Sequence, residues 1–359
     1  MSLCAKWQKH ILQFRFEAGT SRGVLKTKDT WFVQLWDKNN PTIIGIGECG
    51  PLKGLSPDDR PDFEEKLQAV CEKIESLSAS DIALQTIQNH FNLHEFPSIV
   101  FGIETALLDL RNGGKRIIFP TNFSSGKESI PINGLVWMGD ELFMQKQLEE
   151  KIHQGYSCIK LKIGAIDFDS EIKLLESIRK RFSPKEITIR VDANGAFRFD
   201  EAKEKLTILS KYNLHSIEQP IKAGQAEEMK ELCTISPLSI ALDEELIGIY
   251  SLVEKNNLLS HIKPPYIILK PTLLGGIEMS KQWINCAVKN NIGWWITSAL
   301  ESNIGLNAVS QFAASLHVTM PQGLGTGQLY HNNIDSPLTI DNGNLIYDTS
   351  KNWDLSIFS

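Results

Sequence analysis

The chain shows two different patterns of hydrophobic and polar positions, one up to residue 125 and another from Ile130 onward. Up to residue 125, alternating positions predict strands and helical periodicity predicts helices. The predicted strands lie at 5–17, 30–37 and 42–48, and the predicted helices lie at 62–78 and 98–112. The polar stretch 18–28, which contains glycine, is predicted to be a loop between the first two strands. A meander followed by helices indicates an α+β unit over 1–125.

From Ile130 onward, short apolar stretches alternate with amphipathic helical ones. The apolar stretches predict strands at 131–137, 157–163, 186–192, 215–219, 238–243, 266–270, 293–297 and, weakly, 322–325. A helix predicted over 167–182 opens with Asp167, a residue type that caps helix N-termini. Roughly eight β-α units imply parallel strands, so the α/β pattern over 126–328 favours a (β/α)8-type barrel over a doubly wound open sheet. The tail 329–359 is expected to fold back on the first unit.

Composition narrows the classes of partner. The formal net charge is −6, so neither nucleic acid nor an anionic membrane surface is an expected partner. Six cysteines are scattered without C-x-x-C spacing, which favours reduced thiols in a cytoplasmic protein over a disulfide framework or a zinc site. No stretch is long and apolar enough to span a bilayer, and the N-terminus lacks a signal-peptide pattern.

Charged residues follow the predicted barrel strands in order. Active sites of such barrels lie at the C-terminal ends of the strands. These ends supply Lys160 and Lys162, then Asp192 and Asn194, Glu218, Asp243 or Glu244, Lys270, and finally the stretch 297-TSALES-302. One charged residue at a strand end is usually just solvated. A succession of lysine, three acids and lysine after buried apolar runs is different, because burying all of them unpaired would be costly.

The three acids together predict a metal site. Convergent carboxylates need a cation, and hard oxygen ligands favour Mg²⁺ or Mn²⁺, with one ion in the site. A lysine beside a divalent cation and a second ammonium is expected to have a lowered pKa, which suits a general base. The predicted chemistry is removal of the proton α to a substrate carboxylate, with electrostatic stabilisation of the resulting enolate.

The strand-end motifs resemble those of the enolase superfamily, muconate-lactonizing subgroup: KLKIG, RVDANGAF, IEQP, LDEE and ILKPTLLGG, in this order. The resemblance covers nearly the whole chain and implies a modified TIM barrel with an α+β capping domain. Within the superfamily, 297–311 and 323–330 are most similar to the o-succinylbenzoate synthases of menaquinone biosynthesis. The reaction of that family is syn loss of water from a small carboxylate, 2-succinyl-6-hydroxy-2,4-cyclohexadiene-1-carboxylate, to form 2-succinylbenzoate.

The resemblance also implies roles for single residues. It assigns the catalytic lysines Lys162, Lys270 and Lys160, the metal ligands Asp192, Glu218 and Asp243, with Glu244 behind them, and substrate contacts from Arg190, Asn194 and Ser298 with loop 18–28. In this scheme Lys162 takes the α-proton and can return it to the departing hydroxide. Lys160 lowers the pKa of Lys162, and Lys270 faces the enolate from across the ring.

Two other functions stay open. On the same scaffold, a dipeptide epimerase or N-acylamino acid racemase would use Lys162 and Lys270 as opposed acid and base. Dipeptide epimerases carry Asp-x-Asp near strand eight, whereas 322–328 reads QGLGTGQ, which favours a substrate without a free amine. A non-catalytic binding barrel would be expected to lack a lysine or a ligand, and the sequence has them all. Self-association is not determined by the sequence.

Overall fold

The computed structural model describes residues 2–20, 23–164 and 166–358, and three long antiparallel strands form its N-terminal part. They are β1 (Leu3–Thr20), β2 (Gly23–Asp37) and β3 (Asn40–Cys49), in the order β1-β2-β3. The loop predicted at 18–28 is wrong for its described residues, because the β1–β2 ladder continues to the pair Thr20↔Gly23. A register shift between Gln13 and Ala18 puts the hydrophobic alternation out of phase there, which hides the strand in the sequence.

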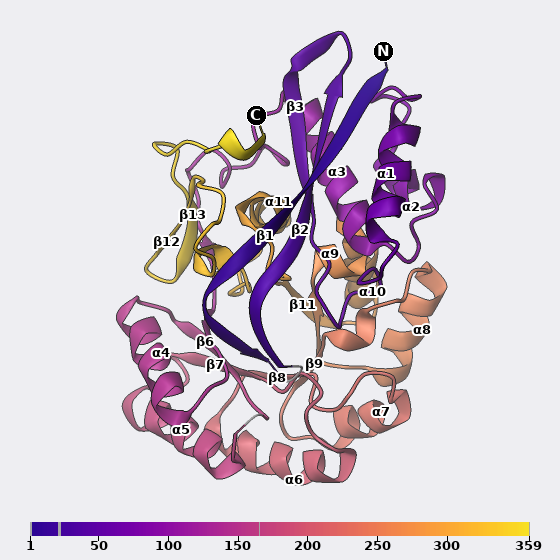
Figure 1. The fold of residues 1–359 in the computed structure, drawn as a ribbon. Coiled ribbons are helices and arrows are strands. Elements are labelled where there is room, and N and C mark those ends of the chain that lie inside the picture. The colour runs from indigo at the N-terminus through magenta and orange to yellow at the C-terminus, as the bar shows by residue number, and fades with distance from the viewer. Residues whose placement is uncertain (1, 21–22, 165, 359) are drawn as a thin grey trace.

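Helices pack against one face of this meander (Figure 1). They are α1 (Phe63–Ile74), η1 (Leu84–Thr86), α2 (Ile87–His90) and α3 (Pro97–Arg111), of which α1 and α3 were predicted. Helix α3 is buried along most of its length. It approaches β3 so closely that a Cβ on Gly47 would lie 1.9 Å from the carbonyl oxygen of Gly102, so only glycine permits this contact.

Seven parallel strands follow in sequential spatial order (Figure 1). They are β5 (Gly134–Val136), β6 (Cys158–Lys162), β7 (Thr188–Asp192), β8 (Ser216–Glu218), β9 (Ile240–Leu242), β10 (Tyr266–Leu269) and β11 (Gly293–Ile296). The helices between and after them are α4 (Glu141–His153), α5 (Phe168–Arg181), α6 (Phe199–Leu209), α7 (Ala226–Ile235), α8 (Leu252–Ile262), α9 (Pro271–Leu274), α10 (Gly276–Lys289) and α11 (Asn303–Ser315). The α/β alternation is therefore confirmed. Asp167 caps α5 as predicted, because its side chain accepts a hydrogen bond from Ser170 N.

The two edges of this curled sheet are joined by residues 322–323. Gln322 N donates to Pro131 O at 2.8 Å, and Gly323 N donates to Ile296 O at 2.9 Å. The strand predicted at 322–325 is thus reduced to two isolated bridges, Ile132↔Gln322 and Thr297↔Gly323. A Cβ at Gly323 would lie 1.8 Å from Thr297 Oγ1, so this segment can lie against β11 only because it has no side chain there.

The predicted strand 131–137 divides into β5 and a short β4 (Ile130–Pro131), which pairs with the C-terminal hairpin. That hairpin consists of β12 (Leu338–Asp341) and β13 (Asn344–Tyr347). The last residues return to the meander, where the Phe358 ring lies edge-on to Phe32 at 5.1 Å. Three further short 3-10 turns lie at Ser210–Tyr212, Glu244–Leu246 and Thr326–Gln328, and a last one covers Ser356–Phe358.

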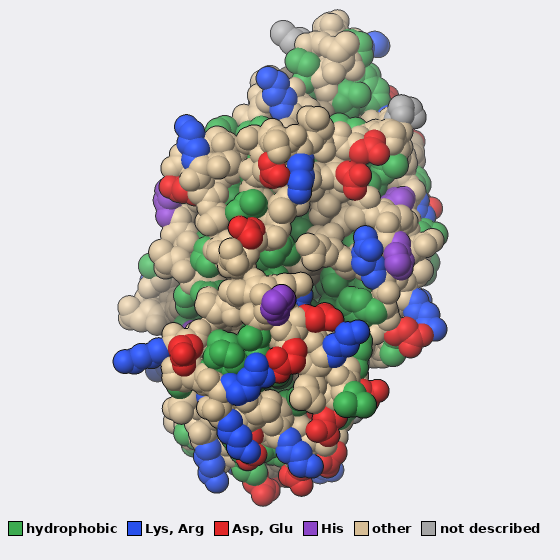
Figure 2. Space-filling model, turned by 90° about the vertical axis from the view of Figure 1, so that its left-hand side faces the viewer, with side chains coloured by type: hydrophobic (Ala, Val, Ile, Leu, Met, Phe, Trp, Pro, Cys, Tyr) green, Lys and Arg blue, Asp and Glu red, His purple; other side chains and the backbone are tan. Residues whose placement is uncertain are grey.

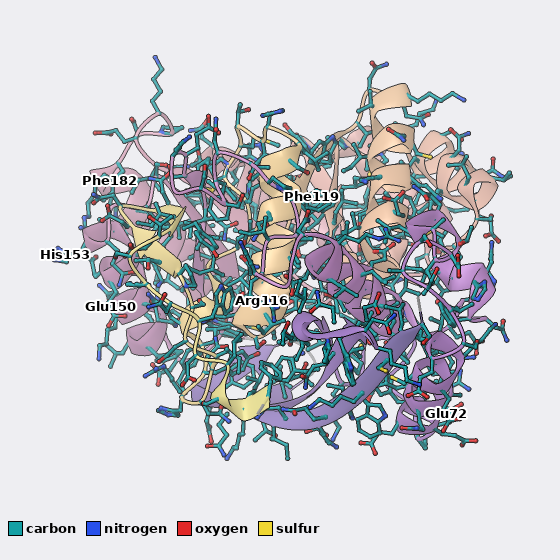
Figure 3. The ribbon with its side chains drawn as sticks, turned by 90° about the horizontal axis from the view of Figure 1, so that it is seen from above. Glu72, Arg116, Phe119, Glu150, His153 and Phe182 are labelled. Carbon is teal, nitrogen blue, oxygen red and sulfur yellow. The ribbon has the colours of Figure 1, made fainter. Side chains whose placement is uncertain are left out.

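Buried polar side chains fasten the N-terminal unit to the barrel helices. Glu48 of β3 accepts hydrogen bonds from Ser302 N at 2.9 Å and Gly305 N at 2.9 Å, at the start of α11. The linker near Arg116 and Phe119 runs beside α11 (Figure 3), where Gln311 Oε1 accepts a hydrogen bond from Phe119 N at 3.0 Å. These contacts fix the meander over the end of the barrel.

The surface carries no single dominant sign of charge on the face shown in Figure 2, where basic and acidic side chains are interspersed. None of the described helices combines the length and hydrophobicity needed to cross a membrane.

Candidate active site

Neighbouring strands bring the predicted lysines and acids into one layer. The register pairs Lys162 of β6 with Asp192 of β7, and Asp192 with Glu218 of β8. Residues paired in this way on parallel strands lie at the same height, and alternation points all three into the interior of the curled sheet. Asp243 follows β9 directly and Lys270 follows β10 directly, so both belong to the same end of the sheet.

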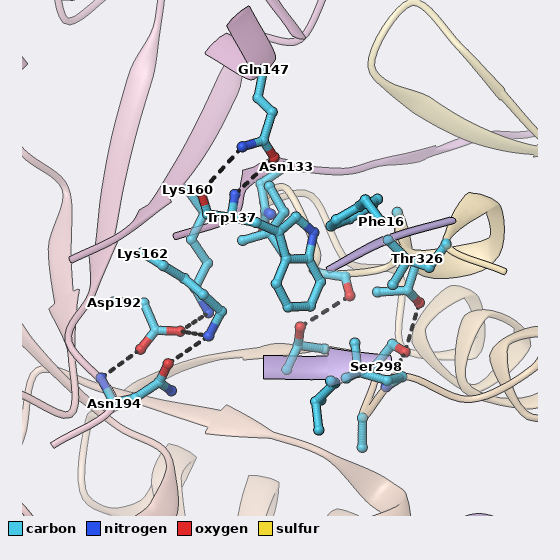
Figure 4. A pocket seen from close by; sticks show the side chains of 18 of the residues that line it. Phe16, Asn133, Trp137, Gln147, Lys160, Lys162, Asp192, Asn194, Ser298 and Thr326 are labelled. Atoms are coloured by element: carbon cyan, nitrogen blue, oxygen red, sulfur yellow. Dashed lines mark hydrogen bonds and ion pairs between the residues drawn. The ribbon is translucent and has the colours of Figure 1, made fainter. Parts of the chain in front are cut away.

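The lysine ammonium groups lie against the carboxylates, and Figure 4 shows Lys160 and Lys162 meeting at Asp192. Lys160 Nζ lies 2.9 Å from Asp192 Oδ2 and also contacts Glu218 Oε2. Lys162 Nζ lies 3.2 Å from Asp192 Oδ2 and donates to Asn194 Oδ1 at 2.5 Å. Every predicted lysine and acid in this part of the chain is therefore brought into one connected cluster.

Lys270 completes the cluster from the other side. Its ammonium contacts Asp243 and lies 3.9 Å from Glu218 Oε1. The side chains of Asp192, Glu218 and Asp243 are only 1–2% exposed, whereas those of Lys160, Lys162 and Lys270 are 10–12% exposed. The acids thus form the floor of the site and the lysines reach toward its opening.

The charged groups of the cluster shift one another's pKa values strongly. Burial alone would lower the pKa of Lys160, but the carboxylates of Asp192 and Glu218 outweigh it, and the pKa is raised. The same balance of burial and Asp243 raises the pKa of Lys270. Burial opposes ionisation of Asp192, yet Lys160 and Lys162 hold the pKa of Asp192 far below its usual range. Burial and the neighbouring Asp192 raise the pKa of Glu218.

The donor set fits a divalent cation in its chemistry. Within the described ranges, no His, Cys, Asp and Glu side chains form a ready-made cage of three or more, because lysine ammonium groups lie between the carboxylates. Glu218 Oε1 is nevertheless buried without a hydrogen-bond partner among the described residues, with the Lys270 ammonium no closer than 3.9 Å, so a cation in direct contact would stabilise it. Three carboxylates on adjacent strands supply the hard oxygen ligands that Mg²⁺ and Mn²⁺ prefer.

A cavity of about 710 Å³ opens above the cluster. Among the described residues, its charged lining consists of six lysines and only two acids: Lys53, Lys146, Lys151, Lys160, Lys162, Lys270, Glu150 and Asp192. Phe16 from the β1–β2 hairpin, Trp137 after β5 and Phe143 of α4 form its aromatic walls. A cationic cavity with aromatic walls suits an anionic, ring-bearing ligand.

Asn194 lines the cavity, and its backbone conformation and hydrogen bonds hold it there. It has a φ of 45°, a left-handed conformation that asparagine tolerates well. Its backbone N–H donates to Asp192 Oδ1 at 3.0 Å, and its side-chain amide donates to Glu244 Oε1 at 3.1 Å. The sequence left open whether Asp243 or Glu244 joins the acidic layer, and the structure places Asp243 on Lys270 and Glu244 on Asn194.

Ser298 also lines the cavity, but its hydroxyl is already in use. Its Oγ donates to Glu301 Oε2 at 2.5 Å and accepts from Thr326 Oγ1 at 2.7 Å and from Leu300 N at 3.0 Å. A serine hydroxyl has one donor and two acceptor positions, and all are occupied. The side chain of Ser298 therefore shapes the wall, and no hydrogen-bonding capacity is left for a substrate.

Arg190 lies away from the cavity. Its guanidinium stacks over the ring of Trp295 at 4.1 Å and donates to Pro321 O at 2.8 Å. It is not among the cavity-lining residues, although it lies on the same face of β7 as Asp192. Period-two alternation therefore identified the correct face but not the depth at which the long side chain ends.

Glu301 was not predicted individually as a site residue, although the stretch 297–302 that contains it was. Glu301 is fully buried and accepts from Thr272 Oγ1, two residues after Lys270, as well as from Ser298 Oγ and Ala299 N. It thereby joins the loops that follow β10 and β11. The signal available was its place inside 297-TSALES-302, where an acid three residues after a serine pointed to a local contact.

Trp137 and Gln147 were missed as well. Gln147 of α4 accepts from Trp137 N at 3.0 Å and donates to Trp137 O at 3.2 Å, which fixes this residue at the end of β5 (Figure 4). The Trp137 ring lies 5.9 Å from Lys162 Nζ. The aromatic at the end of the predicted strand 131–137 could have been noticed, but its glutamine partner on α4 could not.

Comparison with known proteins agrees with this geometry. Residues 144–350, more than half of the chain, match the family described as enolase C-terminal domain-like. A crystal structure of a dipeptide epimerase from Enterococcus faecalis, complexed with Mg and the dipeptide L-Leu-L-Tyr, shares the fold with a TM-score of 0.84 at 18% identity, covering 96% of this chain and 97% of that one. The class is thus that of enolase-type barrel enzymes.

One relative is much more similar. An o-succinylbenzoate synthase from Desulfotalea psychrophila is 46% identical over 94% of this chain and 97% of its own length. The crystal structure of MenC from the same organism superposes with a TM-score of 0.86 at 42% identity, over 96% of this chain and all of that one. The chain belongs to the enolase superfamily and, within it, to the o-succinylbenzoate synthase family.

Proposed function

We propose that this chain is a carbon–oxygen lyase that removes water from 2-succinyl-6-hydroxy-2,4-cyclohexadiene-1-carboxylate to form 2-succinylbenzoate, a step of menaquinone biosynthesis. The relative that is 46% identical over 94% of the chain bears the name of this activity. The carrying observation in the structure is the cavity itself, which is lined by Lys53, Lys146 and Lys151 and by one acid, Glu150, in addition to the charge-balanced cluster. The substrate has two carboxylates and no amine, so it matches that charge.

The acids at the floor of the site are the metal ligands in this proposal. Asp192, Glu218 and Asp243 would hold one Mg²⁺ or Mn²⁺, in line with the divalent-metal dependence of the superfamily. When bound, the cation supplies positive charge beside the substrate carboxylate, where a second negative charge develops as the α-proton leaves. Lys160 and Lys270, which now bridge these carboxylates, would then turn toward the substrate.

Lys162 is the proposed proton carrier. As the free amine, it takes the proton from the carbon that bears the ring carboxylate, and the electron pair of the C–H bond delocalises into that carboxylate as an enolate before it returns to the ring. The C–O bond at the neighbouring carbon then breaks and its electron pair leaves with the hydroxide. Because elimination is syn, the same ammonium can protonate that hydroxide, so water leaves and Lys162 is again neutral.

The neighbours of Lys162 hold it in place for both transfers. Asn194 and Asp192 accept hydrogen bonds from its ammonium, and the Trp137 ring borders it on a third side at 5.9 Å. Lys160 shares Asp192 and adds positive charge beside Lys162. Lys270 follows β10, which is separated from β6 by β7, β8 and β9, so it faces the opposite side of the substrate ring.

The fold assignment behind this proposal is a (β/α)8-type barrel with an α+β capping domain. The hydrogen bonds of 322–323 to both edges of the seven-stranded sheet support closure into a barrel. The proposed divisions are a capping domain over 1–125, a barrel over 126–328 and a returning segment over 329–359. Location in the cytoplasm and self-association stay predictions.

A racemase or epimerase would use the same lysine pair, Lys162 and Lys270. The activities are therefore distinguished by the end of the cavity that holds the part of the substrate remote from the reacting carbon. Gly323, Gly325, Thr326 and Gln328 line this end, and none of them is acidic. Glu301 lies near by, but it is fully buried and its oxygens accept from Thr272, Ser298 and Ala299. A substrate ammonium would therefore find no free carboxylate among the described residues at this end of the cavity, which favours the lyase over a dipeptide epimerase.

The test is a direct comparison of the two chemistries on one preparation. Loss of the cyclohexadiene absorbance and appearance of 2-succinylbenzoate by NMR are followed with Mg²⁺ present, beside racemisation of N-succinyl amino acids by polarimetry. We expect dehydration to be the more efficient reaction. Racemisation without dehydration would overturn the proposal in favour of the racemase.

A further inference from the structure

The cavity has a side compartment between the barrel wall and α4. Its lining there comes from β5, from α4 and from the segment after 323: Asn133, Lys146, Gln147, Lys151, Tyr156 and Gly325. Lys146 is exposed on α4, so this compartment reaches the protein surface. Figure 4 shows Asn133 and Gln147 beside Trp137, at the same end of the cavity.

This compartment is continuous with the layer of the catalytic lysines, because one cavity is lined by both sets of residues. The last hydrogen bond across the seam between β5 and the closing segment runs from Asn133 N to Gln322 O at 2.9 Å. Beyond it lies Gly325, whose Cβ, if present, would be 3.6 Å from Asn133 O and 3.9 Å from the Tyr156 hydroxyl. A larger side chain at Gly325 would therefore project between these groups and narrow the passage.

Lys151 gives the compartment its charge. Its methylene stem lies across Gly134, where a Cβ would be 3.1 Å from Lys151 Cβ, Cγ and Cδ. Its ammonium donates to Gln154 Oε1 at 3.2 Å and lies 5.3 Å from the centre of the Tyr156 ring, and it forms no ion pair with any residue that the structure describes. Burial lowers the pKa of Lys151, because the exposed carboxylate of Glu150 offsets the cost of burying the ammonium only in part.

Two further polar groups point to a ligand. Asn133 is 5% exposed, and its Oδ1 is buried without a hydrogen-bond partner in the described part of the chain, so a turn of this amide by 180° would present its NH2 group to an anion. The Tyr156 hydroxyl forms no side-chain hydrogen bond within the same residues, and burial raises the pKa of Tyr156 to about 12, so it stays a donor. Glu150, the one acid here, is exposed at the rim.

We propose that this compartment binds the carboxylate at the end of the substrate's acyl arm, with Lys151 as its counter-ion and Tyr156 as a hydrogen-bond donor. This inference rests on the proposed function, because it concerns the succinyl group of that substrate. The ring and its own carboxylate occupy the layer of Lys162, Lys270 and the acids. The arm then passes Leu135 and Trp137, which suit its methylene groups, and Gly325.

An anion is favoured over the other ligand classes by the cost of burial. A part-buried ammonium without an anion is unfavourable, and a carboxylate would remove that cost while satisfying its own charge. A neutral arm would leave Lys151 uncompensated, and an amine would add repulsion. The side compartment therefore provides specificity for a substrate that carries a second carboxylate remote from the reacting carbon.

The experiment compares two ligands that differ at the arm end only. Dissociation constants are measured by calorimetry for 2-succinylbenzoate and for its amide at the arm carboxylate, with Mg²⁺ present. We expect the wild-type protein to bind the carboxylate at least about tenfold more tightly, as for one charge-assisted contact. Lys151→Met keeps the stem on Gly134 but removes the charge, and we expect it to bind both ligands about equally.

Lys53→Met is the matched control, because Lys53 lines the same cavity from the other end. We expect it to keep the wild-type preference for the carboxylate. If Lys151→Met keeps that preference, or if Lys53→Met loses it instead, the assignment of the arm is overturned. Binding is measured on product without turnover, so failure of the proposed dehydration would appear separately, as absence of 2-succinylbenzoate from wild-type reactions.

Discussion

Removal of the proposed base gives the sharpest test of the catalytic assignment. General base catalysis by a positioned side chain contributes about 10²–10⁴-fold to turnover, which corresponds to about 2.7–5.4 kcal/mol of transition-state stabilisation. Lys162→Ala should lose turnover in this range. Binding of 2-succinylbenzoate should change much less, because Lys53, Lys146 and Lys151 still line the cavity.

The structure indicates that this variant will fold. Asp192 loses a contact of 3.2 Å to Lys162 but keeps Lys160 at 2.9 Å and the backbone N–H of Asn194 at 3.0 Å. No buried charge is left alone, so the cost to stability should stay near that of one ordinary pair, about 1 kcal/mol. The melting temperature should fall by a few degrees at most.

Lys162→Arg separates charge from proton transfer. Arginine keeps a cation beside Asp192 and Asn194, but it is not deprotonated near neutral pH and cannot act as a base. We expect it to be as inactive as Lys162→Ala in the diene absorbance assay. Added methylamine should restore part of the activity of Lys162→Ala only. Turnover within threefold of wild type in either variant would refute the role of Lys162.

Three other predictions follow from the site and its supports. Chelation should abolish dehydration and added Mg²⁺ or Mn²⁺ should restore it, and turnover that persists in excess chelator would contradict the metal site. Glu301→Leu should lower kcat/KM by about tenfold or more, because it leaves the Thr272 and Ser298 hydroxyls without their acceptor, whereas Glu301→Gln should recover most of it, since Thr272 can reverse its hydroxyl. Equal losses in both variants, tracking the melting temperature, would show that Glu301 acts on stability alone. Burial raises the pKa of Asp58 from 3.8 to about 7. The buried carboxyl is protonated below pH 4, where its contribution to the free energy of unfolding is largest, and this contribution is lost as the pH rises through 7. Asp58→Asn should therefore flatten the fall in unfolding free energy between pH 4 and 7, and an unchanged slope in urea titrations would refute this pKa.

The sequence predicted most of what lies on regular strands. Alternation and order were enough to place Lys160, Lys162 and Asp192 in one cluster, since parallel strands in sequential order bring their C-terminal ends together. The β1–β2 pairing was predicted, but its extension into 18–28 was missed because a register shift near Ala18 breaks the alternation that reveals strands. Contacts made by flexible or long side chains were less accessible, as the displaced guanidinium of Arg190 shows.

Contacts between distant segments were beyond sequence reasoning for another reason. Glu48 meets Ser302 and Gly305 across more than 250 residues, and no local pattern encodes such a pairing. The same holds for the side compartment, which exists because Gly134 admits the stem of Lys151 and Gly325 leaves space beside it. In the sequence, Gly134 and Gly325 only weaken the predicted strands that contain them. In the fold, they leave space for neighbouring side chains.

Charge balance connects the metal, the lysines and the two ends of the substrate. Asp192, Glu218 and Asp243 formally offset Lys160, Lys162 and Lys270, so the cluster is neutral by itself, with the ammonium groups drawn down onto the acids. A divalent cation on the acids adds two positive charges and releases the lysines, while the ring carboxylate of the substrate supplies a negative charge beside them. Each ligand therefore makes the site more favourable for the other, and this coupling must be reciprocal. A mono-anion would leave Lys151 without a buried anion, so the charge balance of the whole cavity favours the dicarboxylate.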